Sequence, residues 1–259
     1  MKNNIIMSVV LLAISIGSYF YFTQKNSSQN SNELIIGIAA GYAPWVSINP
    51  QGEYEGFDID FTRALAERMG KKLVLKDLGC MTSLFTALEQ GKVDGIVWGM
   101  SITKDRLKKF AMVNYQGELV TSYPLMFWKT IPVGITSIVD MNGKTVCIEP
   151  TSSQESVLRK YDRISQLPTE KVDDALLNIQ YGKADAALVE PAIAQKFKNK
   201  FPEIQILDVR LDDADQVAGV GVVIQKDNSG MINQIAQAVA ALKATGVIAQ
   251  FEQKWNMVP

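Results

Sequence analysis

One helix-and-strand pattern occurs twice in this chain, as SLFTALEQGKVDGIVWG at 83–99 and DALLNIQYGKADAALVE at 174–190. Each copy has a helical apolar pattern, a Gly-Lys break, an aspartate and an apolar strand. The shared helix and strand patterns disfavour a chance match, and the offset of 91 residues, from Gly91 to Gly182, is too long for a solenoid repeat. The repeat therefore predicts two similar α/β lobes. Since α/β proteins bind small ligands at strand ends, we expect a ligand cleft between the lobes.

The composition excludes several classes of site. The chain has no histidine, which removes histidine-based triads and nearly all catalytic zinc sites. Its net charge of −1 gives no basic surface for nucleic acid. The two cysteines, Cys80 and Cys147, are far apart and are expected to be separate, partly buried thiols. We therefore predict no catalytic residues, no metal site and no cofactor.

The N-terminus indicates export. Lys2 precedes an apolar run from residue 5 to residue 22, and a Ser/Asn/Gln-rich stretch follows at 23–32. We predict a signal peptide over residues 1–22 and a polar tether over 23–32. No small-residue cleavage site follows the run, and it is long enough to span a bilayer, so an uncleaved membrane anchor through residues 5–22 stays an alternative.

The remaining chain alternates strands with helices, which predicts parallel or mixed sheets. We expect lobe one to comprise residues 33–126 plus 220–259, and lobe two residues 127–219. Extended stretches near 123–129 and 217–224 are the expected crossings between the lobes. Two connecting strands would form a hinge that closes about a ligand.

Three sites at predicted element ends have charges or dipoles suited to a ligand. Arg106 follows the first repeat, and its planar fork matches a carboxylate, although the lysines around it slightly favour a solvated surface arginine. Ser152 and Ser153 begin a helix with the capping-box pattern Ser152-x-x-Glu155, and a helix N-terminus also attracts a carboxylate. Glu190 ends the second repeat and could hold an ammonium group, or be an exposed acid before a proline.

Further candidates lie beside these. Glu149 is a lone acid that ends an apolar strand, and Tyr42, Met81 and Trp98 are apolar or aromatic residues near the expected cleft. Burial in the core is the default for such side chains, but Tyr42 and Trp98 lie in or beside breaks and are better candidates for pocket walls. Arginine, a helix N-terminus, glutamate and aromatic walls together complement a free α-amino acid.

Several motifs resemble those of the polar amino-acid solute-binding proteins of bacterial ABC importers, and they cover residues 33–259 in order. They are YAPW (42–45), GFDIDFTRALAERMG (56–70), GKVDGIVWGMSITKDR (91–106), GKADAALVE (182–190) and ALKATGVIAQFEQKW (241–255). The LVEP sequence and the later Phe201-Pro202 look most like the arginine-binding branch. The resemblance implies a two-lobed periplasmic-binding-protein (Venus-flytrap) fold of the α/β class with a two-strand hinge, in which both chain ends build lobe one.

The resemblance also implies roles for single residues. Arg106 matches the arginine that clamps the ligand carboxylate, with Ser101 in support, and Glu190 matches the acid that holds the ammonium group. Ser153, or the backbone at 152–153, matches a threonine at the second-lobe helix start, and Tyr42 matches a ring that lines the side-chain pocket. The full predicted ligand-binding set is Arg106, Ser101, Gly99, Met100, Tyr42, Trp98, Met81, Ser152, Ser153, Glu190 and Glu149.

The chain departs from the family pattern in the side-chain pocket. Ala39 and Ala40 stand where relatives with cationic ligands have an acid, and Met81 replaces a stacking aromatic. Trp98 is then expected to supply the ring and Glu149 the charge for a guanidinium.

The resulting interpretation is an exported, monomeric, non-enzymatic protein that binds a polar amino acid, with arginine favoured. It would deliver the ligand to an inner-membrane ABC permease from a periplasmic or extracytoplasmic location. Two alternatives stay open: a periplasmic cyclohexadienyl/arogenate-type dehydratase that uses the same cleft, and a ligand-sensing module.

Overall fold

A computed structural model describes residues 32–257. The predicted signal peptide or anchor (1–22), and the tether up to residue 31, lie outside the described residues. Within the described part, no helix combines the length and apolar character needed to cross a membrane. The chain from Leu34 onward forms one compact unit that contains two five-stranded sheets.

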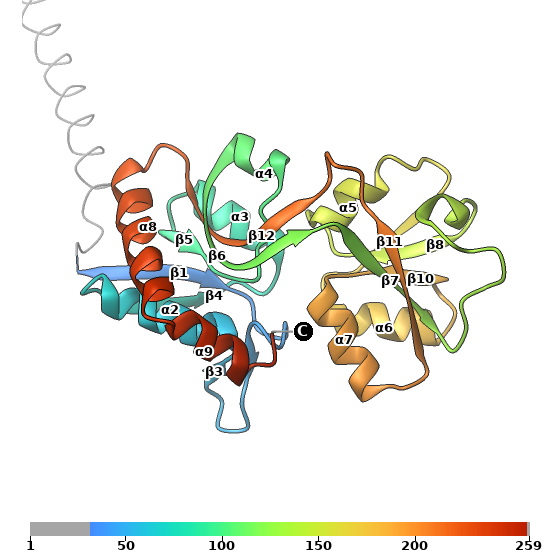
Figure 1. The fold of residues 1–259 in the computed structure, drawn as a ribbon, viewed down its shortest axis with the longest axis horizontal. Helices are drawn as coiled ribbons and strands as arrows, with labels where there is room; N and C mark the ends of the chain where they lie inside the picture. The colour runs from blue at the N-terminus through green and yellow to red at the C-terminus, as the bar shows by residue number, and fades with distance from the viewer. Residues whose placement is uncertain (1–31, 258–259) are drawn as a thin grey trace, which may run out of the picture. The chain divides into compact units, whose positions relative to one another are not determined.

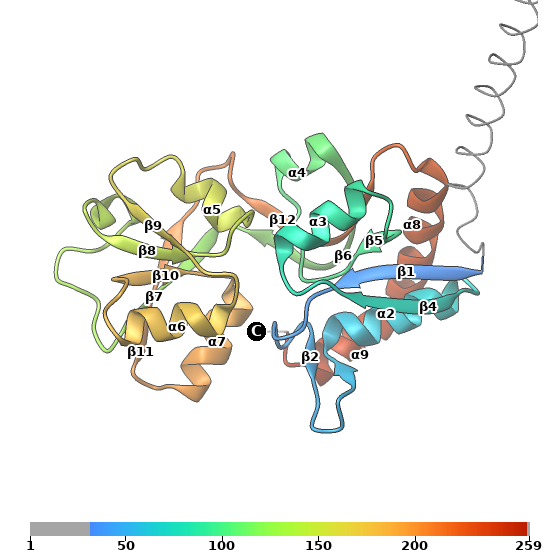
Figure 2. The same ribbon diagram turned by 180° about the vertical axis from the view of Figure 1, so that it is seen from behind.

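The first sheet has the strand order β4-β1-β5-β12-β6 (Figure 1). Its strands are β1 (Glu33–Ile38), β4 (Lys72–Asp77), β5 (Gly95–Ile96), β6 (Phe110–Val120) and β12 (Val217–Gln225). Its helices are α2 (Phe57–Arg68), α3 (Met81–Glu89), α4 (Lys104–Lys109), α8 (Ser229–Ala244) and α9 (Val247–Lys254). A small hairpin of β2 (Ser47–Ile48) and β3 (Tyr54–Glu55) precedes α2, which packs against β4 (Figure 2).

The second sheet repeats this plan with the order β9-β8-β10-β7-β11. Its strands are β7 (Ser122–Trp128), β8 (Thr145–Ile148), β9 (Ser165–Pro168), β10 (Ala186–Leu188) and β11 (Ile204–Arg210). Its helices are η1 (Ile138–Met141), α5 (Ser153–Leu158), α6 (Val172–Gln180) and α7 (Pro191–Lys200). In each sheet the repeated strand pairs in parallel with one neighbour and antiparallel with a strand that comes directly from the other sheet.

Two connections join the sheets (Figure 1). The chain leaves the first sheet at the end of β6, passes Thr121 and enters the second sheet as β7. It returns through 211–216 and re-enters the first sheet as β12. The extended stretches predicted at 123–129 and 217–224 are therefore strands within one sheet each, and the links lie just before them. The predicted lobe boundaries at 126/127 and 219/220 fall inside β7 and β12.

The repeated aspartate has the same role in both lobes. Oδ2 of Asp94 accepts a hydrogen bond from Ile35 N at 2.8 Å, and Asp94 N donates to Ile35 O at 2.7 Å. Oδ2 of Asp185 accepts from Thr145 N at 2.8 Å, and Asp185 N donates to Thr145 O at 2.8 Å. The Gly-Lys-x-Asp motif therefore ties the end of the helix to the parallel strand next to its own. The two-lobe prediction drawn from the repeat is confirmed.

Local details differ from the prediction at two capping sites. Ser152 Oγ accepts from Glu155 N as expected, but Glu155 Oε2 accepts from Thr151 N instead of Ser152 N, so the predicted capping box is half formed. A complete box occurs one helix earlier, between Ser137 and Asp140. Thr151, which replaces Ser152 as the backbone donor to Glu155, has a left-handed conformation with φ of +64°.

Candidate functional site

The two repeats place Gly99 and Glu190 at equivalent positions, just after strands β5 and β10. At Gly99 the first copy has a backbone turn with φ of +55°. At Glu190 the second copy has a half-buried carboxylate at the start of α7. Gly99 has no side chain to offer a ligand, but the chain after it supplies the hydroxyl of Ser101 and the guanidinium of Arg106 on α4.

Arg106 is buried, with only 9% of its surface exposed, which rules out the solvated surface arginine that the sequence left open. Its Nη1 donates to Ser101 O at 2.8 Å, and its Nη2 donates to Thr151 O at 3.2 Å and to Met81 Sδ at 3.2 Å. Thr151 belongs to the second lobe, so this guanidinium bridges the two lobes. Burial lowers the pKa of Arg106, and the negative charge of Glu190 opposes that shift.

Glu190 receives hydrogen bonds from both lobes. Ser101 Oγ and Gln154 Nε2 each donate to its Oε1 at 2.7 Å, and Ser153 Oγ is 3.5 Å from the same oxygen. Tyr123 in turn donates from its hydroxyl to Ser153 Oγ at 2.7 Å. Burial raises the pKa of Glu190, while these donors and Arg106 lower it. Because these bonds from described residues converge on Oε1, Oε2 is the oxygen that can accept from a cationic group.

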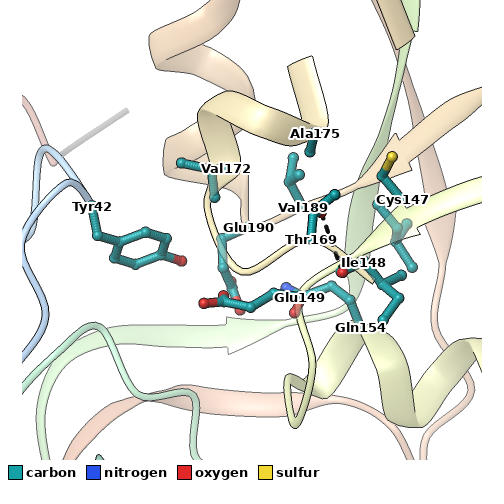
Figure 3. A pocket seen from close by; sticks show the side chains of 11 residues that line it. Tyr42, Cys147, Ile148, Glu149, Gln154, Thr169, Val172, Ala175, Val189 and Glu190 are labelled. Atoms are coloured by element: carbon teal, nitrogen blue, oxygen red, sulfur yellow. Dashed lines mark hydrogen bonds between the residues drawn. The ribbon is translucent and has the colours of Figure 1, made fainter. Parts of the chain in front are cut away.

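A small cavity of about 20 Å³ opens beside Glu190 (Figure 3). That volume admits a water-sized molecule. The Tyr42 hydroxyl points from the first lobe toward Glu190, while the side chains of Glu149, Glu190 and Gln154 lie together on the opposite side. The residues that line the cavity are Tyr42, Cys147, Ile148, Glu149, Gln154, Thr169, Val172, Ala175, Leu188, Val189 and Glu190.

Glu149 is the second acid of this cavity. Its pKa is raised to about 8, chiefly by burial and also by the charge of Glu190, while Arg106 acts to lower it. Burial thus favours the neutral form of Glu149, and a cation that entered the cavity would favour its charged form. Two acids and a tyrosine hydroxyl make the cavity suited to a cationic or strongly hydrogen-bonding group.

Other predicted residues have supporting places. The Trp98 ring lies 4.7 Å from that of Tyr42, centroid to centroid, and its Nε1 donates to Ala39 O at 2.6 Å. Trp98 thus stands behind Tyr42 and is absent from the cavity lining. Met100 is fully buried and its carbonyl accepts from Gly221 N on β12, so its side chain belongs to the core. Ser152 uses its hydroxyl to cap α5.

The structure adds residues that sequence reasoning missed. Gln154 directly follows the predicted Ser152-Ser153 pair, and its position in the first turn of α5 was the available signal. Tyr123 lies on β7 beyond the predicted candidates, and only the fold brings it to Ser153. Asp58 lies in the first turn of α2, and its Oδ2 accepts from Gly99 N at 2.6 Å. Thr151 contributes a carbonyl, which no side-chain pattern reveals.

Both cysteines are free thiols, as expected from their spacing. Cys80 is half-buried at the start of α3, and its sulfur lies 3.3 Å from Ser83 Oγ. Cys147 is fully buried on β8 and lines the cavity, where burial raises its pKa to about 11. A thiol with a raised pKa is a weak nucleophile at neutral pH.

Comparison with known proteins places this geometry in a family. The model of the bacterial extracellular solute-binding proteins, family 3, matches residues 34–258. The chain belongs to this family. The resemblance recognised from the sequence motifs is thereby confirmed, together with the two-lobed α/β fold of periplasmic binding proteins.

Several similar proteins carry names that refer to arginine. The probable ABC transporter arginine-binding protein ArtJ of Chlamydia trachomatis is 29% identical over 236 residues, covering 90% of each chain. The arginine-binding extracellular protein ArtP of Bacillus subtilis is 26% identical over 257 residues, covering 95% of this chain and 96% of ArtP. A crystal structure of the P235GK mutant of ArgBP from T. maritima matches with a TM-score of 0.77 and 26% identity, covering 88% of this chain and 96% of that one.

Proposed function

We propose that this solute-binding protein captures a free α-amino acid between its lobes, with arginine as its ligand, and delivers it to an ABC permease. The observation that carries the proposal is that buried Arg106 and Glu190 both bond to Ser101 and influence each other through their charges, with Glu149 in the adjoining cavity. These are one cation and two acids, which complement the one carboxylate and two cationic groups of arginine. The arginine-binding names of ArtJ and ArtP support the same choice.

Head-group capture uses contacts that the protein now makes with itself. The Arg106 guanidinium donates to the carbonyls of Ser101 and Thr151, which are neutral acceptors. A ligand carboxylate is a stronger, charge-assisted acceptor and fits the planar fork through two parallel bonds. Glu190 then accepts from the ligand ammonium group through Oε2, while Ser101 and Gln154 hold Oε1 in place.

The ligand side chain would extend into the cavity beside Tyr42. A guanidinium there meets Glu149, whose burial without a cation costs free energy. The cavity volume of about 20 Å³ means that an amino-acid side chain enters only as the lobes or side chains shift. The two connections between the sheets, at Thr121 and 211–216, provide a hinge for that movement.

We further propose that the protein acts outside the cytoplasm as a monomer without catalytic activity. The family comprises extracellular proteins, and the apolar run at 5–22 supplies a signal peptide or an anchor. The dehydratase alternative lacks support in the cavity, where the acids face a tyrosine and an amide and no histidine exists to pair with them. A sensory role has no separate observation in its favour.

Calorimetric titration tests the proposal. The protein is unfolded and refolded to remove carried ligand, then titrated with arginine, lysine, ornithine, glutamine and cystine in separate runs. One-to-one binding that is tightest for arginine supports the proposed ligand, and tightest binding of another amino acid overturns the assignment of the side-chain pocket. No binding of any amino acid would overturn the head-group assignment, and turnover of prephenate-like acids would then support the dehydratase.

A further inference from the structure

A buried carboxylate lies behind the ligand site, in the core of the first lobe. Asp58, in the first turn of α2, is 0% exposed. Its Oδ2 accepts from Gly99 N at 2.6 Å and its Oδ1 accepts from the Tyr115 hydroxyl at 2.7 Å. Phe61 stacks on Tyr115 with ring centroids 4.1 Å apart, which packs the ring whose hydroxyl donates to this carboxylate. Burying a carboxylate in this way costs folding free energy, which suggests that Asp58 has a function beyond stability.

The Gly99 amide is the start of the segment that carries the head-group contacts. Residue 99 has a φ of +55°, and a Cβ built there would lie 2.9 Å from the Trp45 ring, so only glycine fits this turn. Two residues later, Ser101 donates to Glu190 and accepts from Arg106. The backbone on the other side is held by Trp98, whose Nε1 donates to Ala39 O.

We propose that Asp58 is a positioning residue for the ligand site, holding the Gly99 amide and thereby fixing the segment from Trp98 to Ser101 that presents Ser101 and the Arg106 partner carbonyl. This inference rests on the proposed amino-acid function. Glycine in a left-handed turn is flexible, and without a fixed acceptor its amide would be free to rotate away. Asp58 is fully buried and does not line the cavity, so its effect on the ligand would pass through Gly99.

The two oxygens of Asp58 allow the positioning role to be separated from a general contribution to stability. Asp58→Ala removes both acceptors, whereas Tyr115→Phe removes only the bond to Oδ1 and leaves the Gly99 bond in place. Asp58→Asn keeps an amide oxygen for Gly99 N and offers an NH₂ group to the Tyr115 oxygen. Burial raises the pKa of Asp58 to about 7, so asparagine imitates the neutral acid that is present below that pH.

The affinity for L-arginine, used as the probe, is measured by calorimetry at a temperature where each variant is folded. We expect Asp58→Ala to weaken binding at least tenfold, while Tyr115→Phe and Asp58→Asn stay within about threefold of the wild type. A tenfold loss corresponds to about 1.4 kcal/mol. Equal losses in Asp58→Ala and Tyr115→Phe would show a structural role only and would overturn the inference.

A second measurement needs no ligand and distinguishes failure of this inference from failure of the proposed function. Hydrogen exchange of the Gly99 amide is followed by NMR in the wild type, Asp58→Asn and Asp58→Ala. Slow exchange in the wild type and in the asparagine variant, with faster exchange in the alanine variant, supports the positioning role. Should the alanine variant not fold, the wild type decides: a Gly99 amide that exchanges as fast as exposed loop amides overturns the inference, and a protected one supports it.

Discussion

Arg106 owes its position to short-range chemistry at the start of α4. Thr103 Oγ1 accepts from Arg106 N at 3.1 Å, which caps the helix and turns the arginine side chain inward over the Phe85 ring. Lys104, Lys108 and Lys109 are exposed on the same short helix. Of the four basic residues on α4, the one that lies three positions after the cap is therefore the one that faces the cleft.

Replacing Arg106 should separate charge from geometry. We expect Arg106→Ala to weaken arginine binding by more than about tenfold, because loss of a buried charge partner usually costs at least ~2 kcal/mol. The affinity of Arg106→Lys should lie between those of the wild type and Arg106→Ala, since lysine keeps the charge and loses the planar fork. Calorimetry measures the dissociation constants, with Arg63→Ala, an exposed arginine of the same lobe, as the matched control. Near-normal affinity in Arg106→Ala would contradict the clamp.

Glu149 should determine selectivity for a cationic side chain. We expect Glu149→Gln to lower the affinity for arginine about tenfold while glutamine binding changes by less than threefold, because the substitution removes a charge that only the guanidinium would meet. Competition binding measures the ratio of the two affinities. Glu170→Gln is the control, since Glu170 is an exposed acid that acts on Glu149 only through its charge. An unchanged ratio in Glu149→Gln would place the guanidinium elsewhere.

At the scale of elements, the repeat predicts the fold well because each copy makes the same contacts between its aspartate and the neighbouring strand. A helix, a left-handed glycine, an aspartate and a strand recur with one spacing, and Asp94 and Asp185 bind their neighbouring strands in the same way. What the repeat cannot predict is where the copies differ. β5 is only Gly95–Ile96, shorter than the apolar run suggests, because the chain turns early at Trp98 and Gly99.

The two repeated aspartates should contribute unequally to stability. Asp94 is half-buried and Asp185 is exposed, so we expect Asp94→Ala to lower the free energy of unfolding by about 2 kcal/mol and Asp185→Ala by about 1 kcal/mol or less. The exposed ion pair of Asp185 with Lys144, at 3.5 Å, adds little. Urea unfolding gives both values, with the asparagine variants as controls that keep an acceptor. A larger loss at Asp185 than at Asp94 would contradict the ranking of the two bonds by burial.

At the scale of the whole molecule, buried acids predict how stability changes with pH. The pKa of Asp58 is raised from 3.8 to about 7 and that of Glu149 from 4.5 to about 8. The folded state therefore binds more protons than the unfolded state between pH ~4 and ~8, and the free energy of unfolding falls as the pH rises through that window. Below pH ~4 both acids are protonated in the folded and the unfolded state, so their burial lowers the free energy of unfolding least there.

Asp58→Asn should remove the Asp58 part of that slope. We expect the variant to gain stability relative to the wild type as the pH rises from 4 to 7, by an amount on the order of a few kcal/mol, because one pKa unit corresponds to about 1.4 kcal/mol. Denaturant unfolding at several pH values measures the difference. A constant difference across that range would mean that Asp58 titrates at its ordinary pKa in the folded protein.

The sequence predicts the site less completely than the fold. Arg106, Ser101, Ser153 and Glu190 come together as the motifs suggest, because each lies at a strand or helix end. Gln154, Tyr123 and the Thr151 carbonyl could not be found in the same way. Tyr123 of β7 reaches Ser153 of α5 only in the folded chain, and the Thr151 carbonyl is placed by a backbone turn; neither leaves a periodic pattern.

The strand order of the first sheet has a consequence for the chain as it is being made. β12 lies between β5 and β6, yet it comes from residues 217–225, after the entire second sheet. A growing chain can therefore complete the second lobe, from β7 to β11, while the first still lacks a central strand. During synthesis the first lobe, which holds Arg106, can be completed only after the chain of the second lobe, which holds Glu190, has been made. The lobe that begins first in the sequence is therefore the last to be completed.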